Sequence, residues 1–127
     1  MSRPQLAPQP YGSAEAFDTL VLQSPLPVLL CFECPWSRSL SPALPRLART
    51  FAGFLRVVIV DVAAHPELAA RYRIRIVPSL LMLKWGTVVE FLIGPIPHRF
   101  LVTRLWPFLG GHSRVRSPSN RGTRRFP

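Results

Sequence analysis

The chain has 127 residues, 48% of them apolar, enough for one domain with a buried core. It carries 16 lysines and arginines against six acids, and its net charge is +10. No run approaches the roughly 18 apolar residues of a transmembrane helix, and so few acids exclude paired-carboxylate catalysis. The proline-rich segment 1–12 lacks the apolar stretch of a signal peptide, so we expect a disordered leader and a cytoplasmic protein.

The first half of the chain predicts a helix, a strand and a second helix. Apolar residues at helical spacing predict a short helix over about 14–22. The apolar run VLLCF follows the breaker SPLP and is typical of a strand buried on both faces. From Pro35 to Phe54 the spacing predicts one long helix, which Pro42 and Pro45 would kink in its first third.

The second half predicts a strand, a short helix, a hairpin and a closing helix. The run FLRVVIVDV is the next buried strand, and Pro66 suits the first position of a short helix. SLLMLKWG and TVVEFLIG read as a hairpin with Gly86 at its turn. Pro97 opens a final helix whose Phe100 and Leu101 we expect to face inward. This order predicts an α/β domain over 13–110, a mixed sheet with helices on both faces.

The segment 111–127 contains five arginines, no acid and no apolar periodicity. We expect a disordered arm that makes weak, non-specific contact with nucleic acid or anionic surfaces, or that is merely solvated. The three histidines, His65, His98 and His112, are too scattered for a metal site. No phosphate-binding glycine loop is present either, so we predict no metal and no resident cofactor.

Several separated features resemble the thioredoxin family, over a stretch from Ala16 to about Leu109. The segment VDVAAHPELAARYRIRIVPSLLMLKWGTVVEFLIG is similar to that family's strand, short helix, proline turn and hairpin. Val77-Pro78-Ser79 stands where the family has its cis-proline loop. Pro42 matches a helix proline that the family places five residues after its second active-site cysteine. The resemblance implies the thioredoxin fold, a central mixed sheet of about four strands, and a role in cell redox homeostasis.

The stretch CFECPWS contains both cysteines and allows two readings. Cys31 and Cys34 have the spacing of a dithiol redox site. Counting back from Pro42, however, the family's C-x-x-C falls on Cys34 and Ser37. Three extended residues also cover about 10 Å, whereas a disulfide needs Cα atoms roughly 4.4–6.8 Å apart. We therefore predict Cys34 as the single nucleophile and Cys31 as a small buried apolar residue.

The surroundings of Cys34 favour a reactive thiol. Pro35 suits the first position of the long helix, so the sulfur would face the positive end of the helix dipole. Such a site favours the thiolate, which is the nucleophile. Ser37 would donate a hydrogen bond to it, while the adjacent Glu33 opposes the charge. Cys-Pro-aromatic-Ser also resembles the glutaredoxin motif without its second cysteine.

Departures from the family argue against ordinary dithiol turnover. Ser37 cannot make the second attack, which releases product from the mixed disulfide. When the chain is aligned to the family through Pro42, Val28 stands at the position of the family's buried aspartate. Ile59 stands at that of the neighbouring lysine that pairs with it. The family's leading strand also looks absent.

Two functions remain open. One is monothiol thiol–disulfide exchange through Cys34 on protein thiols or disulfides, with glutathione as co-substrate. The other is a redox-inactive binding module or co-chaperone, which would grip extended polypeptide by strand-like pairing. A glutathione-assisted iron–sulfur carrier is less well supported, because the Gly-Phe-Ser sequence of such glutaredoxins is absent. Arg73, Arg75 and Lys84 would hold the carboxylates of glutathione. The polypeptide groove would be formed by Trp36, Val77, Pro78 and Ser79.

Overall fold

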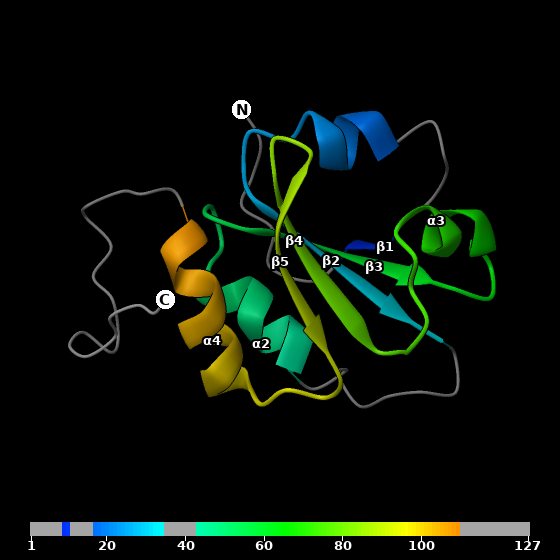
Figure 1. Ribbon diagram of the computed structural model, residues 1–127. Helices are drawn as coiled ribbons and strands as arrows, with labels where there is room; N and C mark the ends of the chain where they lie inside the picture. The colour runs from blue at the N-terminus through cyan, green and yellow to red at the C-terminus, as the bar shows by residue number, and fades with distance from the viewer. Residues whose placement is uncertain (1–8, 11–16, 35–42, 110–127) are drawn as a thin grey trace.

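The computed structural model describes residues 9–10, 17–34 and 43–109. One mixed sheet has the strand order β1-β3-β2-β4-β5, with helices on both faces (Figure 1). The strands are β1 (Gln9–Pro10), β2 (Val28–Glu33), β3 (Arg56–Asp61), β4 (Ser79–Lys84) and β5 (Thr87–Ile93). The helical elements are η1 (Asp18–Leu22), α2 (Ala43–Thr50), α3 (Pro66–Arg71), α4 (His98–Leu105) and η2 (Trp106–Phe108).

The four longer strands confirm the predicted mixed sheet. β2 and β3 are parallel, β4 runs antiparallel to β2, and β5 runs antiparallel to β4. The β4–β5 hairpin turns at Trp85 and Gly86, whose φ angles are 51° and 80°. Two successive positive φ values are typical of the tight turns that match the strand twist, and glycine adopts such values without steric cost.

The expectation that the leading strand is absent is wrong. Gln9 pairs with Val58 and Pro10 with Ile59, which places β1 parallel to β3 at one edge of the sheet. Both residues lie within the segment 1–12 that we predicted as a leader. A strand of two residues has no apolar periodicity to reveal it, and a proline argues against any strand except one at an edge.

The helices follow the prediction with two corrections. α3 begins at Pro66 as predicted. α2 ends at Thr50 rather than Phe54, and Gly53, with φ 88°, lies in the turn that follows. The segment 35–42, with Pro42, lies outside the described residues. In α4, Leu101 is buried but Phe100 is 52% exposed, because consecutive helical residues point to different faces.

The core has two halves, one on each face of the sheet. Alternation along β2 divides its side chains, so that Leu29 and Cys31 face α2 and α4 while Leu30 and Phe32 face η1 and α3. We call these the α2–α4 face and the η1–α3 face. Within the described residues, no helix has the length and apolar character to cross a membrane.

Candidate thiol site at the cis-proline edge

The candidate site lies where β2 ends and β4 begins. Phe32 pairs with Ser79 in the antiparallel ladder of these strands. Cys34 follows two residues after Phe32, and Pro78 directly precedes Ser79, so both lie beyond the ladder at the same edge of the sheet. The Val77–Pro78 peptide bond is cis, as the family resemblance implied. The fold therefore brings the predicted nucleophile and the predicted proline loop to one edge.

Two hydrogen bonds hold the proline loop in place. The Ser79 hydroxyl donates to the carbonyl oxygen of Ile76 at 2.5 Å, and the Gly94 backbone N–H donates to the carbonyl of Pro78 at 2.9 Å. Ser79 and Pro78 are buried, and Val77 is partly exposed. The Ser79 hydroxyl thus bonds to the loop itself, and among the described groove residues Val77 is the one that retains exposed surface.

The two cysteines occupy different environments. Cys31 is completely buried in the core of the α2–α4 face, as predicted, and its Sγ lies 3.7 Å from the Leu29 carbonyl oxygen. Burial, with a smaller effect from the nearby Glu33 carboxylate, raises the pKa of the Cys31 thiol well above its usual value. Cys34 is 7% exposed, and both thiols are free. Cys31 is therefore a poor nucleophile, and Cys34, although also buried, is the thiol that keeps a small exposed fraction.

Glu33 separates the two cysteines and has an unusual carboxyl group. Its Oε2 is buried and accepts no hydrogen bond in the part of the chain that the structure describes. Burial raises the pKa of this carboxyl. Its backbone carbonyl accepts a hydrogen bond from the Val62 N–H at 2.9 Å, which extends the β2–β3 pairing beyond Asp61. The β2 end is thus firmly placed, with a desolvated acid next to Cys34.

The sheet register corrects the predicted relation between Val28 and Ile59. The β3 partner of Val28 is Arg56, and the β3 partner of Ile59 is Cys31. Val28 belongs to the core of the η1–α3 face, whereas Ile59 packs against the core of the α2–α4 face. These two residues are about 10 Å apart along the strands and point to opposite faces. On β2, the residue beside Ile59 is Cys31.

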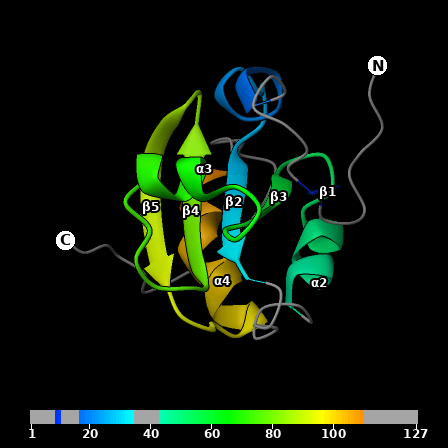
Figure 2. The same cartoon turned by 90° about the vertical axis from the view of Figure 1, so that its right-hand side faces the viewer.

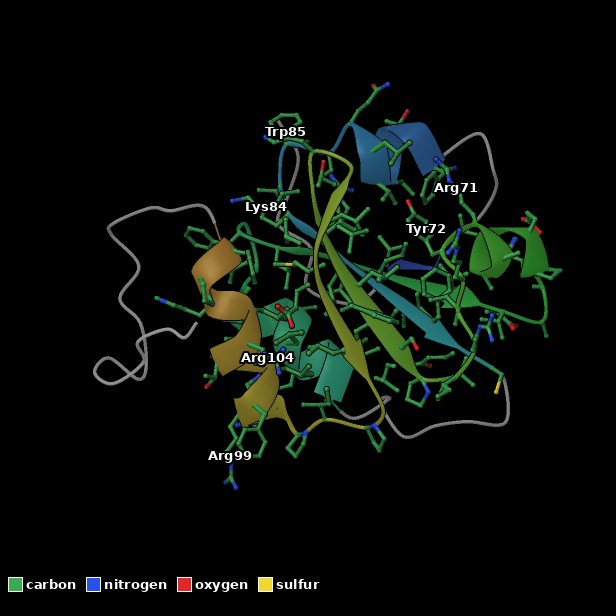
Figure 3. All side chains as sticks on the ribbon, viewed as in Figure 1. Arg71, Tyr72, Lys84, Trp85, Arg99 and Arg104 are labelled. Atoms are coloured by element: carbon green, nitrogen blue, oxygen red, sulfur yellow. The ribbon has the colours of Figure 1, made fainter. Side chains whose placement is uncertain are left out.

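The remaining predicted residues divide into three groups. Trp36 and Ser37, together with the expected helix start at Pro35, lie outside the described residues. Arg73 and Arg75 are exposed in the α3–β4 loop, next to the cis-proline. Lys84 lies beside Trp85 at the hairpin turn (Figure 3), at the far end of β4. A six-residue strand is about 17–20 Å long, so Lys84 cannot bind one small ligand together with the two arginines.

Ile76 and Ile93 also flank the loop, although no sequence pattern pointed to them. Ile93 pairs with Ser79, and both isoleucines expose about half of their surface. Apolar residues in a strand predict burial, and only the position of β5 at the sheet edge leaves Ile93 uncovered. Among the described residues, no group of three or more histidine, cysteine or acidic side chains is arranged to hold a metal ion.

Comparison with known proteins identifies the family. The family model described as thioredoxin matches residues 10–105. The chain belongs to the thioredoxin family. It is 32% identical over 103 residues to thioredoxin from Synechocystis, covering 79% of this chain and 96% of that protein. It is 33% identical over 99 residues to thioredoxin from Haemophilus influenzae, covering 76% of this chain and 89% of that protein.

The fold also matches that of a solved thioredoxin structure. A single-site mutant of thioredoxin from Halobacterium salinarum superposes with a TM-score of 0.71, covering 80% of this chain and 89% of that one. Sequence identity between these two chains is 24%, so this likeness concerns the fold. The chain is a thioredoxin-like protein in which residues 34 and 37 are cysteine and serine.

Proposed function

We propose that the protein carries out thiol–disulfide exchange through Cys34 as its single nucleophile. The observation that carries this proposal is the joint position of Cys34 and the Val77–Pro78 loop at one edge of the sheet. A client segment lying along the partly exposed Val77 would bring its own sulfur to that edge. Cys31 is excluded from this role by its complete burial and by the raised pKa of its thiol.

The proposed cycle uses glutathione as the second thiol. The Cys34 thiolate attacks the glutathione sulfur of a glutathionylated protein, so that the protein's thiolate leaves and takes up a proton. Cys34 is then joined to glutathione in a mixed disulfide. A second glutathione thiolate attacks this disulfide, which regenerates Cys34 and releases oxidised glutathione. Such a cycle requires a reducing compartment such as the cytoplasm.

The residues around Cys34 have supporting roles in this proposal. Ser37 would hydrogen-bond the sulfur but cannot resolve a mixed disulfide, which makes the site a degenerate form of the family's C-x-x-C. Trp36 and Val77 would contact the client, and the buried Pro78 and Ser79 would position the loop, Ser79 through its bond to the Ile76 carbonyl. Arg73 and Arg75, without Lys84, would meet the carboxylates of glutathione.

A second candidate function, a redox-inactive polypeptide-binding module, is favoured by the sheet register. In the family, the buried aspartate lies beside the lysine whose position Ile59 occupies. The β2 residue beside Ile59 is Cys31, so by this register Cys31 stands at the aspartate position. The family's cysteines would then correspond to Ser37 and Leu40, three residues further along than the count from Pro42 gave. Pro45, five residues after Leu40 and within α2, would be the helix proline. Cys34 would then occupy neither cysteine position.

Oxidised glutathione distinguishes the two functions. We would incubate the wild-type protein, Cys34→Ser and Cys31→Ser with oxidised glutathione at pH 8 and measure the intact mass of each. Thiol exchange predicts one adduct in wild type and in Cys31→Ser, and none in Cys34→Ser. An unmodified wild-type protein would contradict thiol exchange, and the polypeptide-binding module would then be the remaining candidate function.

The client groove has its own test. Pro78→Ala is expected to remain folded but to weaken capture of a reduced, unfolded client protein, because the loop no longer presents Val77 in the same way. Pro95→Ala changes an exposed proline outside the loop and serves as the matched control. Equal capture by both variants would contradict a groove at Pro78.

A further inference from the structure

An exposed apolar stripe runs along one side of the hairpin. We define the stripe as Val88, Phe91 and Ile93 of β5 together with Ile76, with exposed fractions of 40%, 46%, 51% and 54%. The three β5 residues pair with Leu83, Leu81 and Ser79. Leu81 and Leu83 belong to the core of the η1–α3 face, so all three project from that face. The Ser79 hydroxyl bonds the Ile76 carbonyl, which brings Ile76 to the Ile93 end of the stripe.

The stripe lies on a free sheet edge. β5 ends the strand order, so one side of its backbone has no strand beside it within the described chain (Figure 2). Proteins usually protect such an edge with charges that point inward or with prolines. The single charged residue of β5, Glu90, contacts Arg104 of α4 on the opposite face. The edge therefore combines unpaired backbone groups with apolar side chains, the two features that extended peptides bind.

Charge is concentrated at one end of the stripe. Arg73 and Arg75 are exposed and directly precede Ile76. No ion pair joins either arginine to an acid among the described residues. Of the described acids, Glu33 and Asp61 end β2 and β3 at the same edge of the sheet, Asp18 begins η1, Glu67 is on α3, and Glu90 contacts Arg104 of α4. The Ile76 end of the stripe therefore carries two arginines that make no ion pair among the described residues.

We propose that β5 docks an extended segment of a partner protein, with alternating apolar residues along the stripe and acidic residues at the Arg73–Arg75 end. The segment would add a strand to the sheet, and its apolar side chains would cover Val88, Phe91 and Ile93. A second copy of this chain is a poor occupant, because its net charge of +10 repels another copy and offers few acids to the arginines. This docking does not depend on the reactivity of Cys34.

Synthetic peptides test the proposal. The probe is a fluorescent ten-residue peptide of alternating valine and threonine that ends in two aspartates, and the comparison peptide ends in two lysines. Neither contains cysteine, so a failure here leaves the thiol proposal untouched, and Cys34→Ser should bind as wild type does. We expect the aspartate peptide to bind at least about tenfold more tightly at low salt, with amide shifts along β5 in NMR spectra.

Matched variants locate the surface. Phe91→Ser is expected to weaken binding of the aspartate peptide about tenfold, whereas Phe100→Ser, at a similarly exposed phenylalanine on α4, should not. Replacing Arg73 and Arg75 together by serine should abolish the preference for aspartate, whereas Arg99→Ser should keep it. Equal losses in Phe91→Ser and Phe100→Ser, equal binding of the two peptides, or a wild-type dimer in sedimentation that Phe91→Ser removes would overturn the proposal.

Discussion

The side chains of β5 are buried on one face of the sheet and exposed on the other. On the α2–α4 face, the Leu92 side chain of β5 is buried in the core and Glu90 contacts Arg104 of α4. On the η1–α3 face, Val88, Phe91 and Ile93 of the same strand are exposed. α4 covers its face out to the edge strand, whereas the helical elements of the other face cover β2, β3 and β4 but leave β5 exposed (Figure 1). Helix placement, rather than strand composition, decides which apolar residues form the core.

The largest expected effect contrasts the two faces directly. Leu101→Ala removes a fully buried side chain of α4 and is expected to lower the free energy of unfolding by about 3 kcal/mol. Phe91→Ala removes a half-exposed side chain on the other face and should cost less than about 0.5 kcal/mol. Urea unfolding followed by circular dichroism measures both. Similar costs would mean that the stripe is covered in solution.

The next effect concerns the buried thiol of the α2–α4 face. Cys31→Ser should lower the free energy of unfolding by about 2 kcal/mol, since a hydroxyl in the core needs a hydrogen bond. The Leu29 carbonyl, 3.7 Å from the sulfur, is too distant for a good one. Cys31→Ala leaves no polar group and should cost about half as much. A serine variant as stable as the alanine variant would show that the hydroxyl finds a partner.

The sequence predicted those features that depend on one segment or on two neighbours. The buried strands, the hairpin turn at Gly86, the start of α3 at Pro66 and the burial of Cys31 follow from local pattern and chain order. The pairing of Cys31 with Ile59 could not be predicted in this way, because the register is set by contacts between strands that are distant in the sequence. A register shift of three residues also moves each side chain to the other face of the sheet. The exposure of Phe91 depends on what packs over the sheet, which no strand pattern records.

A smaller effect is expected for the ion pair that binds β5 to α4. Glu90 and Arg104 are in contact, with the glutamate side chain mostly covered and the arginine half exposed. Arg104→Met keeps much of the apolar stem and should cost roughly 0.5–1 kcal/mol at low salt. The cost should fall in 1 M sodium chloride, because salt screens exposed pairs. A cost that is unchanged by salt would assign it to packing of the stem.

Glu33, at the end of β2, gives the smallest effect and the one with a defined pH dependence. Burial raises the pKa of its carboxyl above the usual 4.5, so the folded state holds this proton more tightly than the unfolded state. Its contribution to stability is complete below pH 4.5 and is lost as the pH rises through the folded pKa. Glu33→Gln removes this loss. It should match wild type near pH 4 and exceed it at pH 7 by less than roughly 1 kcal/mol, since solvent screens a group that is only partly buried.

The control for Glu33 is a carboxylate with the opposite expectation. Glu67 is exposed in the first turn of α3, where the helix dipole favours negative charge. Glu67→Gln should therefore lose a few tenths of a kcal/mol at pH 7. Urea midpoints from pH 4 to pH 8 measure both variants. A Glu33→Gln variant that loses stability at pH 7 would mean that the Glu33 carboxylate has a partner in the folded protein, and a buried acid beside Cys34 would then be held charged.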